Sequence, residues 1–255
     1  MNQTAHVDLS KGAALTELIL QASGTPVNVI SKDPYYLFAS SFLFPFPNRL
    51  ANGTYHFLGS EFTFPFIVFG RPNALHGFVH DKPFIIEAEN ENQLVTSFRY
   101  DGSLDYYPFP FNFMVSYTLE PGAFMIDIEI INKAETAMPF GLGWHPYFHV
   151  NGSLASTALK LPEVARHKLN DNFIPTGHHS AYPRFSDFNT LEGVSLDDSF
   201  SITGPVNSNF IKLENGTCIE IWQDSQFEFL QVYTPGDGKS IAIEPMTCGV
   251  DAWNQ

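Results

Sequence analysis

Two residues of this sequence carry side chains suited to proton transfer, and each stands directly before a proline. One is His145, in the segment Gly141–Phe148 (GLGWHPYF), and the other is Glu244, in the segment Ile241–Pro245 (IAIEP). A residue before proline is disfavoured in the helical region and takes an extended backbone. We therefore expect both side chains to project from strand ends held by a stiff segment. An imidazole and a carboxylate fixed in this way form a candidate general acid–base pair.

The elements that position these residues belong to a large globular chain with an acidic balance. The 255 residues include 25 phenylalanines, 16% of them are charged, and the formal net charge is −14. This length is sufficient for a sizeable core, and all-β folds of this size are commonly single units, so we expect one domain over residues 1–255. The negative charge argues against a nucleic-acid partner, which requires a basic face.

The sequence predicts neither secretion nor a membrane span. The first ten residues are polar and do not resemble a signal peptide, and no run of 18 apolar residues occurs. Two cysteines, Cys218 and Cys248, are too few for a disulfide framework, so reduced thiols are expected. We therefore expect a cytoplasmic protein with no membrane contact. The sequence leaves open whether it is a monomer or a homodimer.

Short apolar segments separated by turns indicate antiparallel β structure. The strongest pattern is a hairpin in which residues 111–119 and 126–130 alternate apolar and polar side chains on either side of Pro121-Gly122. Residues 85–89 and 93–100 predict a second hairpin, and Asn215-Gly216 between apolar runs predicts a third. No segment keeps a helical period over a dozen residues. The pattern therefore predicts an all-β antiparallel sandwich or barrel.

Other segments carry weaker signals. The aromatic residues 35–41 predict a strand, and the Phe-rich residues 57–69 are compatible with a strand, a packed loop or both. Residues 48–53 and 71–77 are expected to be loops. Residues 170–189, rich in Pro, Asn, His and Ser, predict a long loop at the rim of a site.

The segment around His145 resembles the His-Pro-Tyr-Phe motif of the aldose 1-epimerases, or galactose mutarotases. Further pieces occur in the order of that family: Pro47–Leu50 with Gly53–Tyr55, then Leu75–Gly77, a weaker Leu196–Phe200, and finally Ile243–Pro245. Each motif is short, but five in order, from Phe38 to the C-terminus, are specific. The resemblance implies the large antiparallel β-sandwich called the galactose mutarotase-like supersandwich. It also implies an isomerase that interconverts the α and β anomers of a hexose.

The resemblance assigns the acid–base roles. Glu244 would be the base that removes the proton of the anomeric hydroxyl, and His145 would be the acid that protonates the ring oxygen, because an imidazole has a pKa near working pH. Taken alone, a carboxylate is more often solvated or ion-paired, and a histidine among aromatics is more often a satisfied core residue. The companion motifs favour the catalytic roles.

The resemblance also implies a sugar-binding set. His76 would donate a hydrogen bond to the ring oxygen or a neighbouring hydroxyl. Arg49 and Asp197 would hold hydroxyls, with Asp198 as the alternative to Asp197. The remaining predicted contacts are Asn48, Trp144 and Tyr147, although core filling is the commoner role of an aromatic side chain.

Two positions depart from the better-studied galactose mutarotases, where asparagines usually occupy the places of Trp144 and His149. The chain is also shorter, so it is more similar to the compact bacterial branch of the family. A hexose-6-phosphate 1-epimerase is a second hypothesis, which requires a basic cluster from Arg71, Lys82 and Arg99. A third hypothesis is a non-catalytic carbohydrate-binding or regulatory module.

The expected partner is a small-molecule sugar, without cofactor or metal. Mutarotation needs an acid and a base beside a bound pyranose, but no electron sink. The pairs His76/His80 and His145/His149 have a spacing that would chelate a metal on a helix. On a strand, at ~3.3 Å per residue, the members of each pair would lie about 13 Å apart, too far to share an ion.

Overall fold

The computed structural model describes residues 3–30, 36–65 and 72–255, and their regular structure is almost entirely antiparallel β-sheet. An eight-stranded sheet has the order β17-β16-β19-β22-β23-β13-β4, with β14 also paired to β23. Its strands are β17 (Pro175–Ala181), β16 (Val164–Leu169), β19 (Asp197–Ile202), β22 (Phe229–Tyr233), β23 (Ser240–Met246), β13 (Gly143–Trp144), β14 (Tyr147–His149) and β4 (Phe42–Leu43).

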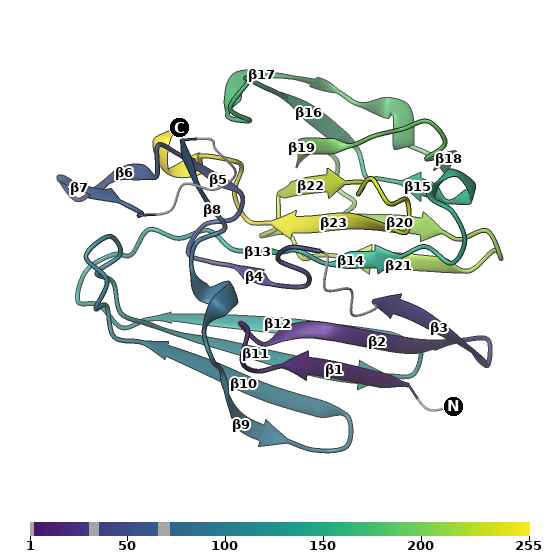
Figure 1. Ribbon diagram of the computed structural model, residues 1–255, viewed down its shortest axis with the longest axis horizontal. Helices are drawn as coiled ribbons and strands as arrows, with labels where there is room; N and C mark the ends of the chain where they lie inside the picture. The colour runs from purple at the N-terminus through teal and green to yellow at the C-terminus, as the bar shows by residue number, and fades with distance from the viewer. Residues whose placement is uncertain (1–2, 31–35, 66–71) are drawn as a thin grey trace.

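Two smaller sheets lie in the lower half of Figure 1, below the eight-stranded sheet. One has the order β12-β11-β10-β9 and the other the order β1-β2-β3. Their strands are β12 (Ala123–Asn132), β11 (Phe111–Glu120), β10 (Gln93–Tyr100), β9 (Ile85–Glu89), β1 (Thr4–Asp8), β2 (Ala14–Ala22) and β3 (Thr25–Ile30).

The remaining strands form a four-stranded sheet and two strand pairs. The sheet has the order β18-β15-β20-β21, and the pairs are β5-β8 and β6-β7. Their bounds are β18 (Asn189–Thr190), β15 (Ala158–Lys160), β20 (Ser208–Lys212), β21 (Cys218–Trp222), β5 (Arg49–Ala51), β8 (Asn73–Leu75), β6 (Thr54–Phe57) and β7 (Ser60–Thr63). Single-turn 3-10 helices occur at η1 (Val79–Asp81), η2 (Leu154–Ser156), η3 (Pro183–Phe185) and η4 (Ala252–Asn254). In the described part of the chain, no helix is both long and apolar enough to span a bilayer.

The core consists of two clusters of different composition. One is mostly aliphatic and joins the eight-stranded sheet to β2, β3, β15 and β20, with Ile241 and Ile243 of β23 among its members. The other is mostly aromatic and lies against β10 and β11, with Phe44 and Phe113 fully buried in it. Because side chains alternate across a strand, the core residues of β23 leave Ala242 and Glu244 facing the other side of the sheet. That second face carries the candidate site.

The predicted all-β antiparallel fold is confirmed, as are its hairpins. Strands β11 and β12 pair from Phe111↔Asn132 to Glu120↔Ala123, and Phe111, Phe113, Val115 and Tyr117 are buried as their spacing predicts. Strands β9 and β10 form the second hairpin, and β20 and β21 form the third across Asn215-Gly216.

Five local predictions are wrong or only partly tested. The expected strand over 35–41 is a turn over 36–41, with positive φ at Phe38 and Ser40, and residue 35 lies outside the described residues. The expected loops at 48–53 and 71–77 contain the pair β5-β8. The expected loop 170–189 contains β17, an edge strand whose exposed polar side chains hide its backbone pairing with β16. Within 57–69 the described part contains the second half of the β6-β7 pair, and residues 66–69 lie outside the described residues.

Candidate active site

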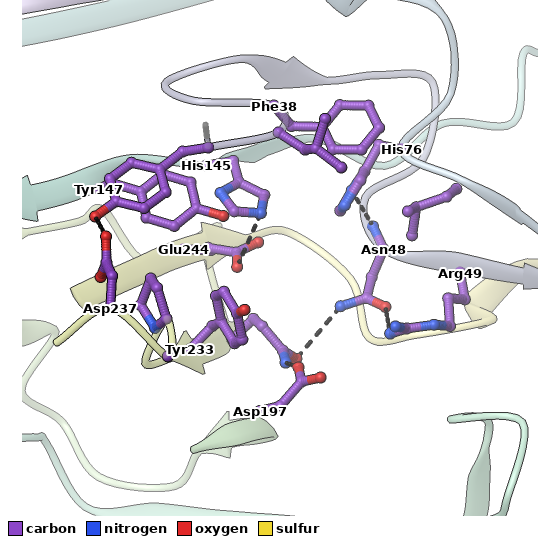
Figure 2. A pocket seen from close by; sticks show the side chains of 16 residues that line it. Phe38, Asn48, Arg49, His76, His145, Tyr147, Asp197, Tyr233, Asp237 and Glu244 are labelled. Carbon is purple, nitrogen blue, oxygen red and sulfur yellow. Dashed lines mark hydrogen bonds and ion pairs between the residues drawn. The ribbon is translucent and has the colours of Figure 1, made fainter. Parts of the chain in front are cut away.

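A cleft of about 480 Å³ opens on the Glu244 face of the eight-stranded sheet. Figure 2 shows the side chains that line it. They come from five regions far apart in sequence: Tyr36, Leu37, Phe38, Asn48, Arg49, Leu75, His76, His145, Tyr147, Asp197, Gln231, Tyr233, Pro235, Gly236, Asp237 and Glu244. The cleft is rich in groups that form hydrogen bonds, as expected of a site for a polyhydroxylated ligand.

Strand register places one group of these side chains. Asp197 of β19 is opposite Tyr233 of β22, and Gln231 of β22 is opposite Glu244 of β23. Residues opposite one another, and residues two apart on one strand, share a face of the sheet. Asp197, Gln231 and Glu244 therefore point into the cleft from three adjacent strands.

His145 is fixed between the short strands β13 and β14. Its backbone N–H donates to the carbonyl of Ser41 (3.0 Å), and its own carbonyl accepts from the N–H of Ser40 (2.8 Å). The imidazole Nε2 lies 3.3 Å from Oε1 of Glu244, and both side chains are buried (Figure 2). The two residues that precede prolines thus meet, as the sequence suggested.

Burial shifts the pKa values of Glu244 and His145 in opposite directions. Burial raises the pKa of Glu244 well above its ordinary value; the negative charge of Asp197 adds to this, and Arg49 opposes it. Burial lowers the pKa of His145 to about 4. Among the residues that the structure describes, Oε2 of Glu244 has no hydrogen-bond partner. Burial therefore favours the protonated carboxyl of Glu244 beside the neutral imidazole of His145, and one carboxyl oxygen remains available to a ligand hydroxyl.

Two hydrogen bonds join Asn48 and His76. The N–H of His76 donates to the carbonyl of Asn48 (2.8 Å), and the N–H of Asn48 donates to Nδ1 of His76 (3.1 Å). Since Nδ1 accepts, neutral His76 carries its proton on Nε2 and is a donor there. Burial lowers the pKa of His76 well below its usual value, and His145 and Arg49 lower it further, so the neutral form persists.

The close approach of the Phe44 backbone explains why a glycine, Gly77, follows His76. Its φ is +64°, and a Cβ at this position would lie 2.2 Å from the carbonyl oxygen of Phe44. Only glycine permits this approach, in which Phe44 and Gly77 form a β-bridge. The bridge places His76 against the 36–41 turn, where Phe38 contacts the rings of His76 and His80.

A hydrogen-bonded chain joins the polar side chains of the cleft. The Arg49 guanidinium donates to Oδ1 of Asn48 (3.0 Å), and Nδ2 of Asn48 donates to Oε1 of Gln231 (3.3 Å). Nε2 of Gln231 then donates to Oδ1 of Asp197 (2.8 Å). Gln231 was not predicted from the sequence. The signal that could have found it is its place opposite Glu244, but the register of β22 against β23 has to be known first.

Aromatic rings form the wall beside His145. Tyr147 stacks on His145 (ring centroids 5.0 Å apart), and Tyr36 stacks on Tyr147 (4.5 Å). The Tyr36 hydroxyl donates to Oδ2 of Asp237 (2.6 Å), in the turn between β22 and β23. This stack limits the movement of the His145 ring.

The structure brings seven of the eight predicted site residues into one cleft. The exception is Trp144, which lies on the opposite side of the strand from His145. Its indole packs between the two core clusters and donates to the carbonyl of Ser40 (3.1 Å). Of the two adjacent carboxylates, Asp197 lines this cleft, whereas Asp198 is buried and accepts from Nε of Arg166 (2.8 Å).

The basic residues considered for a phosphate do not line this cleft where they are described. Lys82 pairs with Asp81, and Arg99 pairs with Glu87 on β9. Arg71 lies outside the described residues. Residues 3–30, 36–65 and 72–255 contain no group of three His, Cys, Asp or Glu arranged to hold a metal ion.

Comparison with known proteins identifies the family. The model of the aldose 1-epimerase family matches residues 4–255, so the chain belongs to that family. The crystal structure of a galactose mutarotase-like protein from Clostridium acetobutylicum has a TM-score of 0.88 at 20% identity, and the match covers 99% of this chain and 84% of the other. The aldose epimerase homologue from C. elegans has a TM-score of 0.81 at 20% identity, covering 96% and 86%. Among curated sequences, the uncharacterized Escherichia coli protein YihR is 24% identical over 251 residues, covering 95% of this chain and 80% of YihR.

Proposed function

We propose that the protein is an aldose 1-epimerase that interconverts the α and β anomers of a free hexose, with Glu244 as base and His145 as acid. The observation that carries this proposal is the buried contact of 3.3 Å between the two groups at the wall of a polar cleft. Burial moves their pKa values toward one another's ordinary range. Such matched acid–base pairs are characteristic of sites that move protons.

The reaction needs one proton removed and one supplied. Glu244 takes the proton of the anomeric hydroxyl as C1 becomes a carbonyl, the bond from C1 to the ring oxygen breaks, and His145 protonates that oxygen. After rotation about the C1–C2 bond the steps reverse, and the ring closes on the other face. Each proton returns to the group that gave it, so the enzyme is unchanged.

The geometry of a hemiacetal explains why the acid and the base touch. The anomeric oxygen and the ring oxygen are bonded to the same carbon, so one neighbouring pair of groups reaches both. A sugar hydroxyl that donates to Oε2 of Glu244 stabilises the ionised carboxylate, and the carboxyl proton then passes to His145. Substrate binding thereby prepares the pair for ring opening.

The other cleft residues hold the sugar. His76 donates from Nε2 to the ring oxygen or a neighbouring hydroxyl, and the linked Arg49, Asn48, Gln231 and Asp197 bind the hydroxyls further from C1. Tyr147 offers an aromatic face to the C–H side of the ring. Because these polar side chains bind one another before substrate arrives, little reorganisation is needed on binding.

The charges of the cleft favour an unphosphorylated hexose. Among the described residues that line it, the carboxylates Asp197, Asp237 and Glu244 outnumber the single guanidinium, Arg49. A phosphate needs the opposite balance. A binding module without turnover would need sugar contacts but no buried acid–base pair.

Polarimetry of freshly dissolved α-D-glucose and α-D-galactose tests the proposal, using the wild type, Glu244→Gln and the control Glu129→Gln. Glu129 is an exposed carboxylate of β12. We expect the wild type and Glu129→Gln to accelerate mutarotation equally and Glu244→Gln to lose about 10³-fold in kcat, as is typical of a lost acid–base group. The final optical rotation is the same in every case, since the equilibrium belongs to the sugar.

Three outcomes contradict parts of the proposal. Equal acceleration by the wild type and Glu244→Gln retains the activity but rejects Glu244 as its base. If the wild type accelerates neither sugar but does accelerate glucose 6-phosphate, the phosphate-specific alternative replaces it. If no aldose is accelerated while sugars still bind, the protein is a carbohydrate-binding module.

A further inference from the structure

The strand that carries Arg49 into the cleft, β5, is short and has one open edge. On the other edge it pairs with β8, and just before β5 the carbonyl of Asn48 accepts from the N–H of His76 (2.8 Å). In an antiparallel pair, backbone groups point toward and away from the partner strand in alternate residues. The backbone groups of Arg49 and Ala51 therefore face away from β8. In the part of the chain that the structure describes, no strand pairs with β5 on that edge.

Asp251 occupies the open edge of β5. Its N–H donates to the carbonyl of Arg49 (2.8 Å), and its Oδ1 accepts from the N–H of Ala51 (2.8 Å), 200 positions away in the chain. A single buried residue thus takes the place of a neighbouring strand. Since a buried backbone group without a partner costs about as much as a lost hydrogen bond, these two contacts fix the position of β5.

The C-terminal residues hold the Asp251 carboxylate in place. Asp251 has a left-handed backbone (φ +58°, ψ +28°), which aspartate adopts more readily than most residues. Nδ2 of Asn254 donates to Oδ1 of Asp251 (2.8 Å) and to the carbonyl of Thr54 (3.0 Å). Trp253 lies against Tyr55 in the aromatic core, with ring centroids 4.6 Å apart. The carboxylate is therefore anchored on both sides.

The position of β5 decides where the Arg49 guanidinium lies. The guanidinium donates to Oδ1 of Asn48 (3.0 Å), and its carbon lies 4.6 Å from the centre of the Phe173 ring. These contacts orient the head of a long side chain, but they do not fix the backbone from which it extends. Asp251 is not among the described residues that line the cleft, so it reaches a ligand only through β5. A displacement of about 1 Å in such a supporting element is enough to weaken a site.

We propose that Asp251 is a positioning residue that holds β5 so that Arg49 meets a hydroxyl of the bound sugar. This proposal rests on the mutarotase function proposed above, in which Arg49 binds a hydroxyl remote from C1. Such a contact is made equally in the ground state and in the transition state. Its loss therefore raises KM and leaves kcat nearly unchanged.

Polarimetry on α-D-glucose with Asp251→Gly, Asp251→Asn and the control Asp105→Gly tests this role. Glycine keeps the left-handed backbone and removes the carboxylate, so we expect KM to rise about tenfold and kcat to stay within about twofold. Asparagine tolerates the same backbone and offers an amide oxygen in place of Oδ1, so its KM should stay within about threefold of the wild type. Asp105 is exposed, and its replacement should change neither constant.

A double-mutant cycle with Arg49→Ala shows whether Asp251 acts through Arg49. Arg49→Ala alone should raise KM about tenfold or more, because a charged hydrogen-bond donor is lost. In the Arg49→Ala background, Asp251→Gly should then raise KM by less than about twofold, since the side chain that it positions is gone. A purely structural effect of Asp251 would not depend on the residue at position 49.

Three results would overturn the positioning role. One is a lower free energy of unfolding in Asp251→Gly, by urea denaturation, with an unchanged KM. Another is a rise in KM that multiplies fully with that of Arg49→Ala. If Asp251→Gly does not fold, Asn254→Ala replaces it, because it removes a donor that holds the carboxylate. KM should then rise about threefold, and an unchanged KM is the third contrary result.

Failure of the proposed function is distinguishable from failure of the positioning role. If the wild type accelerates no aldose, the mutarotase function fails, and the equilibrium affinity for D-glucose takes the place of KM in the same comparison. An equal affinity in the wild type and in Asp251→Gly would then overturn the positioning role as well. A wild type that neither accelerates mutarotation nor binds a hexose overturns both proposals.

Discussion

The strand pairs β11-β12 and β22-β23 have the same antiparallel geometry and opposite roles. In β11, buried apolar and aromatic residues alternate with half-buried residues that are mostly polar, so one face meets the aromatic core and the other keeps access to water. In β23 every residue from Ser240 to Met246 is buried, Glu244 included. Strand β11 therefore has a partly solvated face, whereas no residue of β23 is exposed.

This difference explains why we place the proposed acid–base chemistry on β23. A polar side chain on the open face of β11 remains hydrated, so no function is needed to explain why a polar residue occurs there. Glu244 lies between the aliphatic core behind its strand and the cleft in front, where an ionised carboxylate loses its hydration. A buried carboxyl that contacts an imidazole is retained at a cost in stability, and the proposed role of Glu244 as a base would account for that cost.

The largest predicted effect contrasts one residue from each pair. Phe113→Ala should lower the free energy of unfolding by about 3–5 kcal/mol, because it removes a fully buried ring that contacts Phe42, Phe44 and Phe84. Glu244→Gln should change it by no more than about 1 kcal/mol, since a neutral amide of the same shape replaces a carboxyl disfavoured by burial. Urea denaturation monitored by tryptophan fluorescence measures both.

Ser116→Ala is the control on the half-buried face of β11, and its expected effect is within about 0.5 kcal/mol. The comparison would be broken if Glu244→Gln proved as destabilising as Phe113→Ala. Glu244 would then be a structural residue of the core, and its burial would need no catalytic explanation.

The same comparison shows how much of the structure can be predicted from the sequence. The β11-β12 hairpin was predictable because its register follows from local alternation and one turn. The meeting of His145 and Glu244 was anticipated through the family motifs, although 98 residues separate them along the chain. Gln231 was missed because its role depends on pairing with β23, which nothing in the residues around it specifies.

Trp144 and β17 show two further limits of sequence reasoning. Trp144 neighbours the catalytic candidate in sequence, yet strand alternation directs it to the core. Strand β17 pairs only through its backbone at the edge of the sheet, so its exposed polar side chains resemble those of a loop. In both cases the deciding information is which face a residue occupies, and this is a property of the assembled sheet.

A second, smaller effect concerns pH and the buried imidazole beside β23. Burial lowers the folded-state pKa of His145 from 6.5 to about 4, so the folded state binds fewer protons than the unfolded chain between these values. Above pH 6.5, the titration of His145 does not reduce the free energy of unfolding. As the pH falls from 6.5 toward 4, the unfolded chain binds the extra proton, and the free energy of unfolding decreases by an amount on the order of 3 kcal/mol. His145→Gln should remove this loss.

Measurement in the Glu244→Gln background keeps the neighbouring carboxyl from titrating. Urea denaturation between pH 7.5 and about 4 should show a shallower decline for His145→Gln than for its parent, while the exposed His56→Gln, in the same background, should follow the parent. If the free energy of unfolding declined in parallel for all three proteins, His145 would titrate like a solvated histidine. The groups beside β23 would then be as accessible to water as the half-buried face of β11.

The smallest predicted effect separates two adjacent carboxylates that lie on opposite faces of β19. Asp197→Asn should raise KM for the monosaccharide about tenfold with little change in stability, because Asp197 faces the cleft and is bound by Gln231. Asp198→Asn should leave KM for the monosaccharide unchanged and lower the free energy of unfolding by at most about 1 kcal/mol, since its partner Arg166 is half-exposed to water. Polarimetric kinetics and urea denaturation on both variants distinguish the two roles. A reversal, with KM following Asp198 and stability following Asp197, would show that the sugar binds beside the β16-β17 hairpin and that the cleft at Glu244 is not its primary site.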